Sequence, residues 1–221
     1  MAKSGLIIMD KKKIPNQEKV WDAVASDWRK FRVAPVKEVI DFLKDKQGNI
    51  LDLSCGSGRN FCKVNGTLYG IDFSKQQLKY AEDYAKEKGF NVILKKAGAE
   101  KLPFEDNFFD ACIFIASLHC IEDEKKRKQA LEETYRVLKP NAGLLLTVWD
   151  KNQARFRKEK KDFLLSWTVD GPRRIRYYYL YEKDELKKLV ESVGFKIEKI
   201  FDNTQPDGLT SKRNIVVYVR K

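Results

Sequence analysis

Two aspartates and a run of small residues form the pattern with the clearest chemistry in this chain. The segment Ile50-Leu-Asp-Leu-Ser-Cys-Gly-Ser-Gly-Arg59 is apolar as far as Leu53 and then becomes rich in glycine, and Leu68-Tyr-Gly-Ile-Asp72 ends on an aspartate 20 residues after Asp52. Glycines allow a sharp turn and let a ligand approach the backbone N–H groups. An acid at the end of the next strand can accept hydrogen bonds from ribose hydroxyls, so the pattern predicts an adenosine site.

This turn differs from the two common phosphate-binding loops. A dinucleotide fingerprint needs Gly-x-Gly-x-x-Gly, and only Gly56-Ser-Gly58 is present. A phosphate loop would continue with Gly-Lys-Ser/Thr, which does not follow here. The alternative to a nucleoside site is a tight strand-to-helix turn that binds no ligand.

Strands that alternate with helices are expected to position this turn. Apolar runs predict strands at about 49–53, 91–96, 108–116, 144–149, 195–202 and 213–220, and one that ends at Asp72. Helices are predicted after Asn16, at about 36–43, 75–88, 122–138 and 183–193, and for only a turn or two after Gly58. The alternation implies an α/β fold, with a parallel sheet and helices on both faces. Residues 1–15 are expected to form a partly ordered arm.

Length and composition indicate one domain of 221 residues, of which 43% are hydrophobic. No apolar run approaches the roughly 18 residues of a membrane span, so we expect a soluble, cytoplasmic protein. The four cysteines form no Cys-x-x-Cys motif. They are therefore expected to be free thiols, and no metal site is predicted.

The net charge of +12 favours a polyanionic partner such as RNA. Between residues 151 and 176, nine Lys and Arg stand against three acids. A lysine-rich composition would also raise the charge, but this clustering predicts a nucleic-acid contact. The candidate RNA-binding residues are Arg155, Arg157, Lys158, Lys160, Lys161, Arg173 and Arg174.

The glycine turn resembles motif I of the class I S-adenosylmethionine-dependent methyltransferases, Asp/Glu-x-Gly-x-Gly-x-Gly, with Ser54 at the first glycine position. Gly98-Ala-Glu-Lys-Leu-Pro-Phe104 resembles the family's adenine loop, although the usual aspartate is replaced by Gly98, so that Glu100 is a candidate substitute. Arg136-Val-Leu-Lys-Pro140 matches the helix exit that precedes the fifth strand.

This resemblance covers residues 48–150. It implies a Rossmann-like, seven-stranded, mostly parallel sheet with an antiparallel last strand, and S-adenosyl-L-methionine as cofactor. The residues it implies for cofactor binding are Asp52, Ser54, Cys55, Gly56, Gly58, Asp72, Phe73, Ala99, Glu100 and Ala116.

A closer resemblance extends from about Val20 to the C-terminus. Ala116-Ser-Leu-His119, the basic insertion with Trp167, and Arg176-Tyr-Tyr-Tyr-Leu-Tyr181 together look like the tRNA wobble-uridine carboxymethyl methyltransferases. Those enzymes convert 5-carboxymethyluridine in the anticodon to its methyl ester. The family commonly has histidine at the positions of Tyr179 and Cys120.

The closer resemblance implies specific roles outside the cofactor loops. Arg32 and Arg176 would hold the substrate carboxylate or a nearby phosphate, and His119 would donate to the base or ribose. Tyr177 and Tyr178 would shape the uridine pocket. A small zinc-binding activator subunit is also implied, and we expect it near Phe90, Val92, Ile93 and Leu94.

The resulting division of the chain is an N-terminal arm with helices (1–47), a cofactor-binding core (48–150), a basic substrate-binding insertion (151–181) and a C-terminal helix with a strand hairpin (182–221). Two other functions stay open at this point. One is methylation of a small molecule such as a metabolite, quinone or lipid. The other is a non-catalytic RNA-binding module that has kept the fold.

Overall fold

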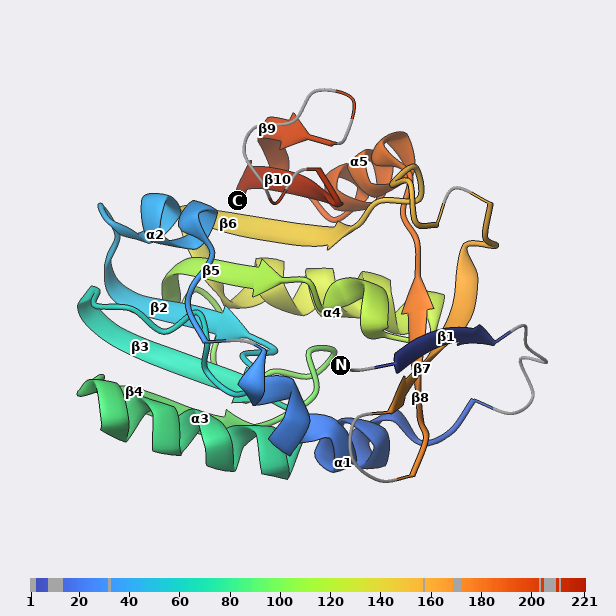
Figure 1. Ribbon diagram of the computed structural model, residues 1–221. Helices are drawn as coiled ribbons and strands as arrows, with labels where there is room; N and C mark the ends of the chain where they lie inside the picture. The colour runs from blue at the N-terminus through green and yellow to red at the C-terminus, as the bar shows by residue number, and fades with distance from the viewer. Residues whose placement is uncertain are drawn as a thin grey trace.

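A computed structural model describes residues 3–7, 14–31, 33–156, 158–168, 172–202, 204, 210 and 212–221 (Figure 1). The first half contains β1 (Lys3–Ile7), α1 (Gln17–Lys30), α2 (Lys37–Leu43), β2 (Gln47–Leu53), β3 (Asn65–Asp72), α3 (Lys75–Lys88), β4 (Val92–Lys96) and β5 (Phe109–Ile115). The second half contains η2 (Leu118–Cys120), α4 (Glu124–Val137), β6 (Leu138–Trp149), β7 (Asp162–Thr168), β8 (Arg174–Tyr179), α5 (Lys183–Ser192), β9 (Lys196–Phe201) and β10 (Asn214–Arg220).

The main sheet has seven strands in the order β4-β3-β2-β5-β6-β10-β9. The strands from β4 to β6 run parallel, whereas β10 is antiparallel to both of its neighbours. The fold class is therefore as predicted, including the antiparallel last strand.

Helices cover both faces of this sheet because its central strands are apolar on both sides. Ile50 of β2 packs in a core with α2 and α3, while its neighbour Leu51 packs in the opposite core with α4 and α5. Side chains of adjacent strand residues point to opposite faces, so a run of buried residues such as β5 supplies both cores.

Side-chain caps fix where the helices begin. Asn16 accepts a hydrogen bond from the Lys19 N–H at 3.0 Å, and Ser74 accepts one from the Gln77 N–H at 3.1 Å. Gly89 ends α3 with a φ of 69°, a conformation that favours glycine. The predicted helix at 75–88 is thereby confirmed.

A second, three-stranded antiparallel sheet, in the order β1-β7-β8, was not predicted from the sequence. Residues 3–7 form a strand within it, rather than belonging to an arm. In Figure 1 this small sheet lies beyond the arrowheads of the parallel strands, close to α1. The basic insertion therefore contains ordered strands, which form a wall facing the carboxyl ends of the main sheet.

Two local expectations differ from the structure. Residues 59–64 contain no helix, because the short connection turns directly into β3. β6 begins at Leu138, so the predicted exit loop is part of a strand, with Asn141 at a φ of 65°. Within the described segments, no helix has both the length and the apolar character needed to cross a bilayer.

Candidate functional site

A cleft of about 1030 Å³ opens between the carboxyl ends of the parallel strands and the wall formed by α1 and the small sheet. We call its two parts the glycine-loop end and the aromatic end. The glycine-loop end is lined by residues that follow β2, β3 and β4, namely Ser54, Cys55, Gly56, Ser57, Arg59, Asn60, Asp72, Phe73, Gln77, Gly98, Ala99 and Glu100. The aromatic end is lined by His119, Trp149, Phe156 and Tyr178.

The glycine loop needs left-handed backbone at three alternate positions. Ser54, Gly56 and Gly58 have φ values of 58°, 55° and 82°. Ser54 thus adopts a conformation that a glycine would adopt more easily. A Cβ on Gly58 would lie 2.6 Å from the Phe61 ring, so this glycine allows close packing and does not line the cleft.

Asp72 connects the end of β3 to the glycine loop and to α3. Its Oδ2 accepts from the Gly56 N–H and its Oδ1 from the Ser74 N–H, each at 2.9 Å. Burial raises the pKa of Asp72 to about 6, although the two backbone hydrogen bonds lower it. The carboxylate lines the cleft at the position expected for a ribose acceptor.

Asp52 lies deeper, beneath the glycine loop, and does not itself line the cleft. It is 1% exposed, and neither carboxylate oxygen has a hydrogen-bond partner. Burial and the charge of Asp72 hold its pKa well above the usual range. Buried acceptors are normally hydrogen-bonded, so the unpaired Asp52 carboxyl is unusual among the described residues.

The predicted adenine loop follows β4 and places Gly98, Ala99 and Glu100 in the cleft. A Cβ on Gly98 would lie 2.6 Å from a carboxylate oxygen of Glu100. The Glu100 side chain therefore occupies the space that an aspartate at position 98 would take. Glu18 of α1 also lines the cleft and is paired with Lys96 at the end of β4, at 2.7 Å.

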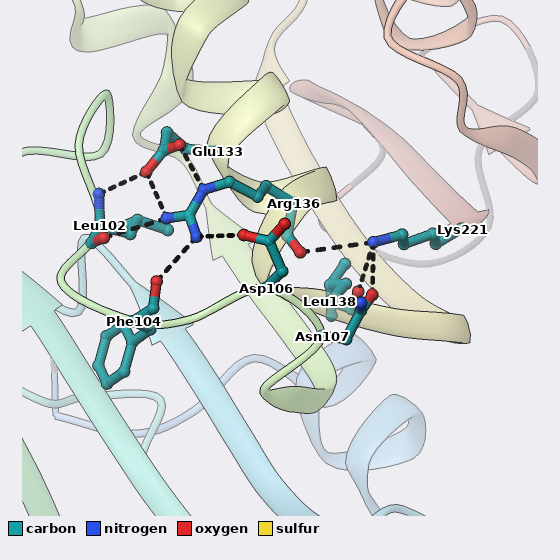
Figure 2. Close-up of polar contacts among 8 residues, drawn as sticks. All are labelled: Leu102, Phe104, Asp106, Asn107, Glu133, Arg136, Leu138 and Lys221. Carbon is teal, nitrogen blue, oxygen red and sulfur yellow. Dashed lines mark hydrogen bonds and ion pairs between the residues drawn. The ribbon is translucent and has the colours of Figure 1, made fainter.

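Figure 2 shows how the far end of this loop is held. Arg136 of α4 donates to the carbonyl oxygens of Leu102 and Phe104, at 3.1 and 2.8 Å, and to the carboxylates of Glu133 and Asp106. Glu133 in turn accepts from the Leu102 N–H at 2.7 Å. The loop has no regular secondary structure, and the hydrogen bonds of this guanidinium hold it in place.

Stacked rings form the aromatic end. Trp149 and Tyr178 lie 4.3 Å apart at 11°, and His119 stacks on Trp149 at 5.1 Å. The His119 Nδ1 accepts a hydrogen bond from the backbone N–H of Trp149 at 3.3 Å, so the neutral ring carries its proton on Nε2. Burial lowers the pKa of His119 to about 3, and the imidazole is therefore a neutral donor at physiological pH.

Arg176 does not line the cleft but lies directly behind its wall. Its guanidinium is 1% exposed and lies over the rings of Trp21, Trp28 and Trp167 at 5.6, 5.0 and 4.7 Å, and it donates to the Tyr178 hydroxyl. Among the described residues no carboxylate pairs with it. Ring faces stabilise a desolvated cation, which explains how the charge can be buried there.

Tyr177 points away from the cleft. Its hydroxyl donates to Asp162 and accepts from Arg127, and its pKa is raised mainly by burial. Its backbone N–H donates to the Gln17 side chain at 2.9 Å, which attaches α1 to β8. The structure therefore gives Tyr177 a supporting position rather than one inside the pocket.

The predicted RNA-binding cations are dispersed. Arg155 lines the cleft, whereas Lys161 is paired with Glu182 and Glu185 at 3.1 and 3.0 Å. Lys158, Lys160, Arg173 and Arg174 lie outside the cleft. Arg32 and Arg157 fall outside the described residues.

Several cleft residues carry no sequence motif and were not predicted. They are Asn16, Gln17, Glu18, Trp21, Trp28, Arg59, Asn60, Gln77, Glu122, Lys126, Trp149, Gln153, Phe156, Lys212, Arg213 and Asn214. Some are placed by backbone contacts: the Arg213 carbonyl accepts from the Asp150 N–H at 3.2 Å and from the Gln153 side chain at 3.1 Å.

The other predicted cofactor residues, Phe73 and Ala116, line the cleft. Within the described part of the chain, no cluster of metal-ligating side chains occurs.

Comparisons with known proteins agree with this geometry. Residues 51–146 match the model of the methyltransferase domain family. A tRNA (carboxymethyluridine(34)-5-O)-methyltransferase of Arabidopsis thaliana is 36% identical over 154 residues, which are 68% of this chain and 35% of the relative. The Xenopus tropicalis enzyme of the same name, alkbh8, is 33% identical over 159 residues, or 70% of this chain and 24% of the relative. The chain thus spans about a third or less of these relatives.

Among solved structures, a SAM-dependent methyltransferase of Methanosarcina mazei has the same fold, with a TM-score of 0.66 and 24% identity. The match covers 85% of this chain and 98% of the other. The domain match, the sheet order and the cleft at the strand ends together show that the chain has the class I methyltransferase fold and is an S-adenosylmethionine-dependent methyltransferase.

Proposed function

We propose that the protein methylates the carboxylate of a 5-carboxymethyl-type uridine at the wobble position of tRNA, which yields the methyl ester. The aromatic end of the cleft carries this proposal. Its stacked rings suit a flat base, and the cations Arg155, Lys212 and Arg213 at the same end suit the flanking phosphates. The printed names of the Arabidopsis and Xenopus relatives support the same substrate class.

For this methyl transfer the protein must bind the two substrates and align them, but it does not need a general base. When bound, S-adenosylmethionine supplies an electrophilic methyl group on a positively charged sulfur. The acceptor carboxylic acid has an ordinary pKa near ~4, so it is already ionised at neutral pH. The protein must hold the carboxylate, exclude water from it and orient it. A neutral His119, which cannot take up a proton at this pH, fits the role of a hydrogen-bond donor to the base or ribose.

Arg176 supplies the positive charge that an anionic substrate needs. The Arg176 guanidinium donates to the Tyr178 hydroxyl, and Tyr178 lines the cleft, so the positive charge lies one side chain away from the cleft. This hydrogen bond also fixes the position of the Tyr178 ring. We therefore propose that it attracts the carboxylate from behind the aromatic wall; Arg32 stays a proposed second anion-binding residue.

The acidic groups of the glycine-loop end suit the other substrate, which is cationic. We propose that Asp72 binds the ribose, that Glu100 and the Ala99 N–H bind adenine, and that Asp52 acts from beneath the glycine loop that would hold the amino-acid part. Ser54, Cys55, Gly56, Phe73 and Ala116 would complete this surface, and Gly58 would hold its shape.

A small zinc-binding activator subunit is proposed as a partner at β4. This strand lies at the edge of the main sheet, and Ile93 on it is 40% exposed. An exposed edge strand can pair with a strand of another protein.

The direct test is methyl transfer from labelled S-adenosylmethionine to tRNA that lacks the wobble ester, with and without the activator, followed by nucleoside analysis. The expected product is a base-labile methyl ester on the wobble uridine. The Asp72→Ala variant serves as the cofactor-binding control. If wild-type protein binds the cofactor but transfers no methyl group to tRNA under either condition, a small-molecule substrate replaces this proposal. RNA binding without cofactor affinity would instead indicate a non-catalytic module.

A further inference from the structure

Gln77 lies in the first turn of α3 and faces the glycine-loop end of the cleft. Its side chain is 2% exposed, and its amide oxygen Oε1 has no hydrogen-bond partner. A buried acceptor without a donor costs about 1–3 kcal/mol, and native proteins rarely keep one. The group is therefore expected to receive its donor from a bound ligand.

The surroundings of Gln77 place this oxygen near Gly56, whose N–H donates to Asp72. The Gln77 backbone N–H donates to Ser74 Oγ at 3.1 Å, and the Ser74 N–H donates to Asp72 at 2.9 Å. The Gln77 Oε1 also lies 3.9 Å from the position a Cβ on Gly56 would occupy, and the Gly56 N–H donates to the other oxygen of Asp72. Gln77 and Asp72 therefore flank the same glycine.

We propose that Gln77 is a second ribose-binding residue of the cofactor site, whose amide oxygen accepts a hydrogen bond from one ribose hydroxyl of the adenosine moiety. A ribose diol brings two donors, and each oxygen of Asp72 already accepts one backbone N–H. A third carboxylate here would add to the charge of Asp72, which already opposes the ionisation of Asp52. A neutral amide supplies the extra acceptor without that cost.

This inference rests on the cofactor part of the proposed function and is independent of the tRNA part. The test replaces the amide by a side chain of similar length, Gln77→Met, with Gln76→Met as the matched control, because Gln76 is the neighbouring glutamine and does not line the cleft. Two quantities are measured: the thermal unfolding midpoint without ligand, and the dissociation constants of S-adenosylhomocysteine and methylthioadenosine by calorimetry.

We expect Gln77→Met to weaken both ligands about tenfold, or about 1.4 kcal/mol, because both contain the ribose. The unfolding midpoint should stay the same or rise, because an unsatisfied buried acceptor has been removed. A lower midpoint with unchanged dissociation constants would overturn the proposal, since Gln77 would then be structural. An equal loss of affinity in Gln76→Met would overturn it as well.

Deoxy analogues identify the contact itself. If Gln77 accepts from one hydroxyl, either 2′-deoxy- or 3′-deoxy-methylthioadenosine should bind wild type and Gln77→Met equally, because the interaction is absent in both. A full tenfold loss with both analogues would exclude a ribose contact. Wild-type protein that binds no adenosine ligand would instead refute the cofactor assignment underlying the proposed function.

Discussion

The two ends of the cleft are built in different ways from the same strand ends. At the glycine-loop end, short segments after β2, β3 and β4 bring together acids and left-handed turns. At the aromatic end, rings and cations come from η2, β6, β8 and the segment before β10. The first end suits a cationic nucleoside and the second an anionic one. Methyl transfer requires these two nucleosides to come into contact. A cleft with two different ends allows this contact and still keeps the acids of one end apart from the cations of the other.

The largest effect should come from removing the central acid of the glycine-loop end. Asp72→Ala should raise the dissociation constant of S-adenosylmethionine roughly 30-fold, because a hydrogen bond to a charged acceptor contributes about 2 kcal/mol. Calorimetry measures it. Asp22→Ala is the control, since Asp22 also binds Ser74 but does not line the cleft. Unchanged affinity in Asp72→Ala would remove this residue from the cofactor site.

At the aromatic end, Lys212→Ala combined with Arg213→Ala should weaken tRNA binding about tenfold and make it less dependent on salt. Cofactor affinity should not change, because neither side chain belongs to the glycine-loop end. Filter binding at several salt concentrations gives both values. Lys158→Ala with Lys160→Ala provides the comparison from the basic insertion. If that pair has the larger effect, the RNA approaches over the insertion and the division of the cleft is wrong.

A third prediction concerns the protonation of His119. Its pKa is about 3 in the folded protein and about 6.5 when exposed, so the unfolded chain takes up the proton first as the pH falls. The stability contributed by the neutral ring is complete above pH 6.5 and declines below it. Between pH 6.5 and 5.5, wild type should lose about 1 kcal/mol more than His119→Gln in urea unfolding. Equal losses would mean that His119 is accessible to protons.

The smallest effect should be at Glu100. Glu100→Ala should raise the dissociation constant of S-adenosylhomocysteine about fivefold, because one hydrogen bond contributes about 1 kcal/mol. The loss should be absent for S-inosylhomocysteine, which lacks the adenine amino group. Because the Glu100 carboxylate fills the space beside Gly98, adding Gly98→Asp should restore affinity in the Glu100→Ala background. If the loss is not specific to the adenine amino group and Gly98→Asp does not restore affinity, backbone groups alone recognise the adenine.

Residues that belong to contiguous motifs could be predicted from the sequence, whereas residues that only the fold brings to the cleft could not. Asp52, Gly56 and Asp72 belong to contiguous strand-and-turn patterns, so their local geometry is visible in the chain order. Gln77 carries no motif, because only the unpaired state of its buried oxygen distinguishes it from any polar helix residue. Arg213 was missed for another reason: its backbone carbonyl accepts from the Asp150 N–H and from the Gln153 side chain, which lie some 60 residues away in sequence.

The wall of the cleft also imposes an order on folding. β1 pairs with β7 through Lys3 and Thr168, and α1 is attached to β8 by the hydrogen bond from Tyr177 to Gln17. During synthesis, β1 must wait for β7, which is made more than a hundred residues later, whereas α1 can first pack on α3 and β2 can pair with β3. Contacts of such long sequence separation form slowly. The cofactor core can thus assemble on the emerging chain before the wall that separates it from solvent is in place.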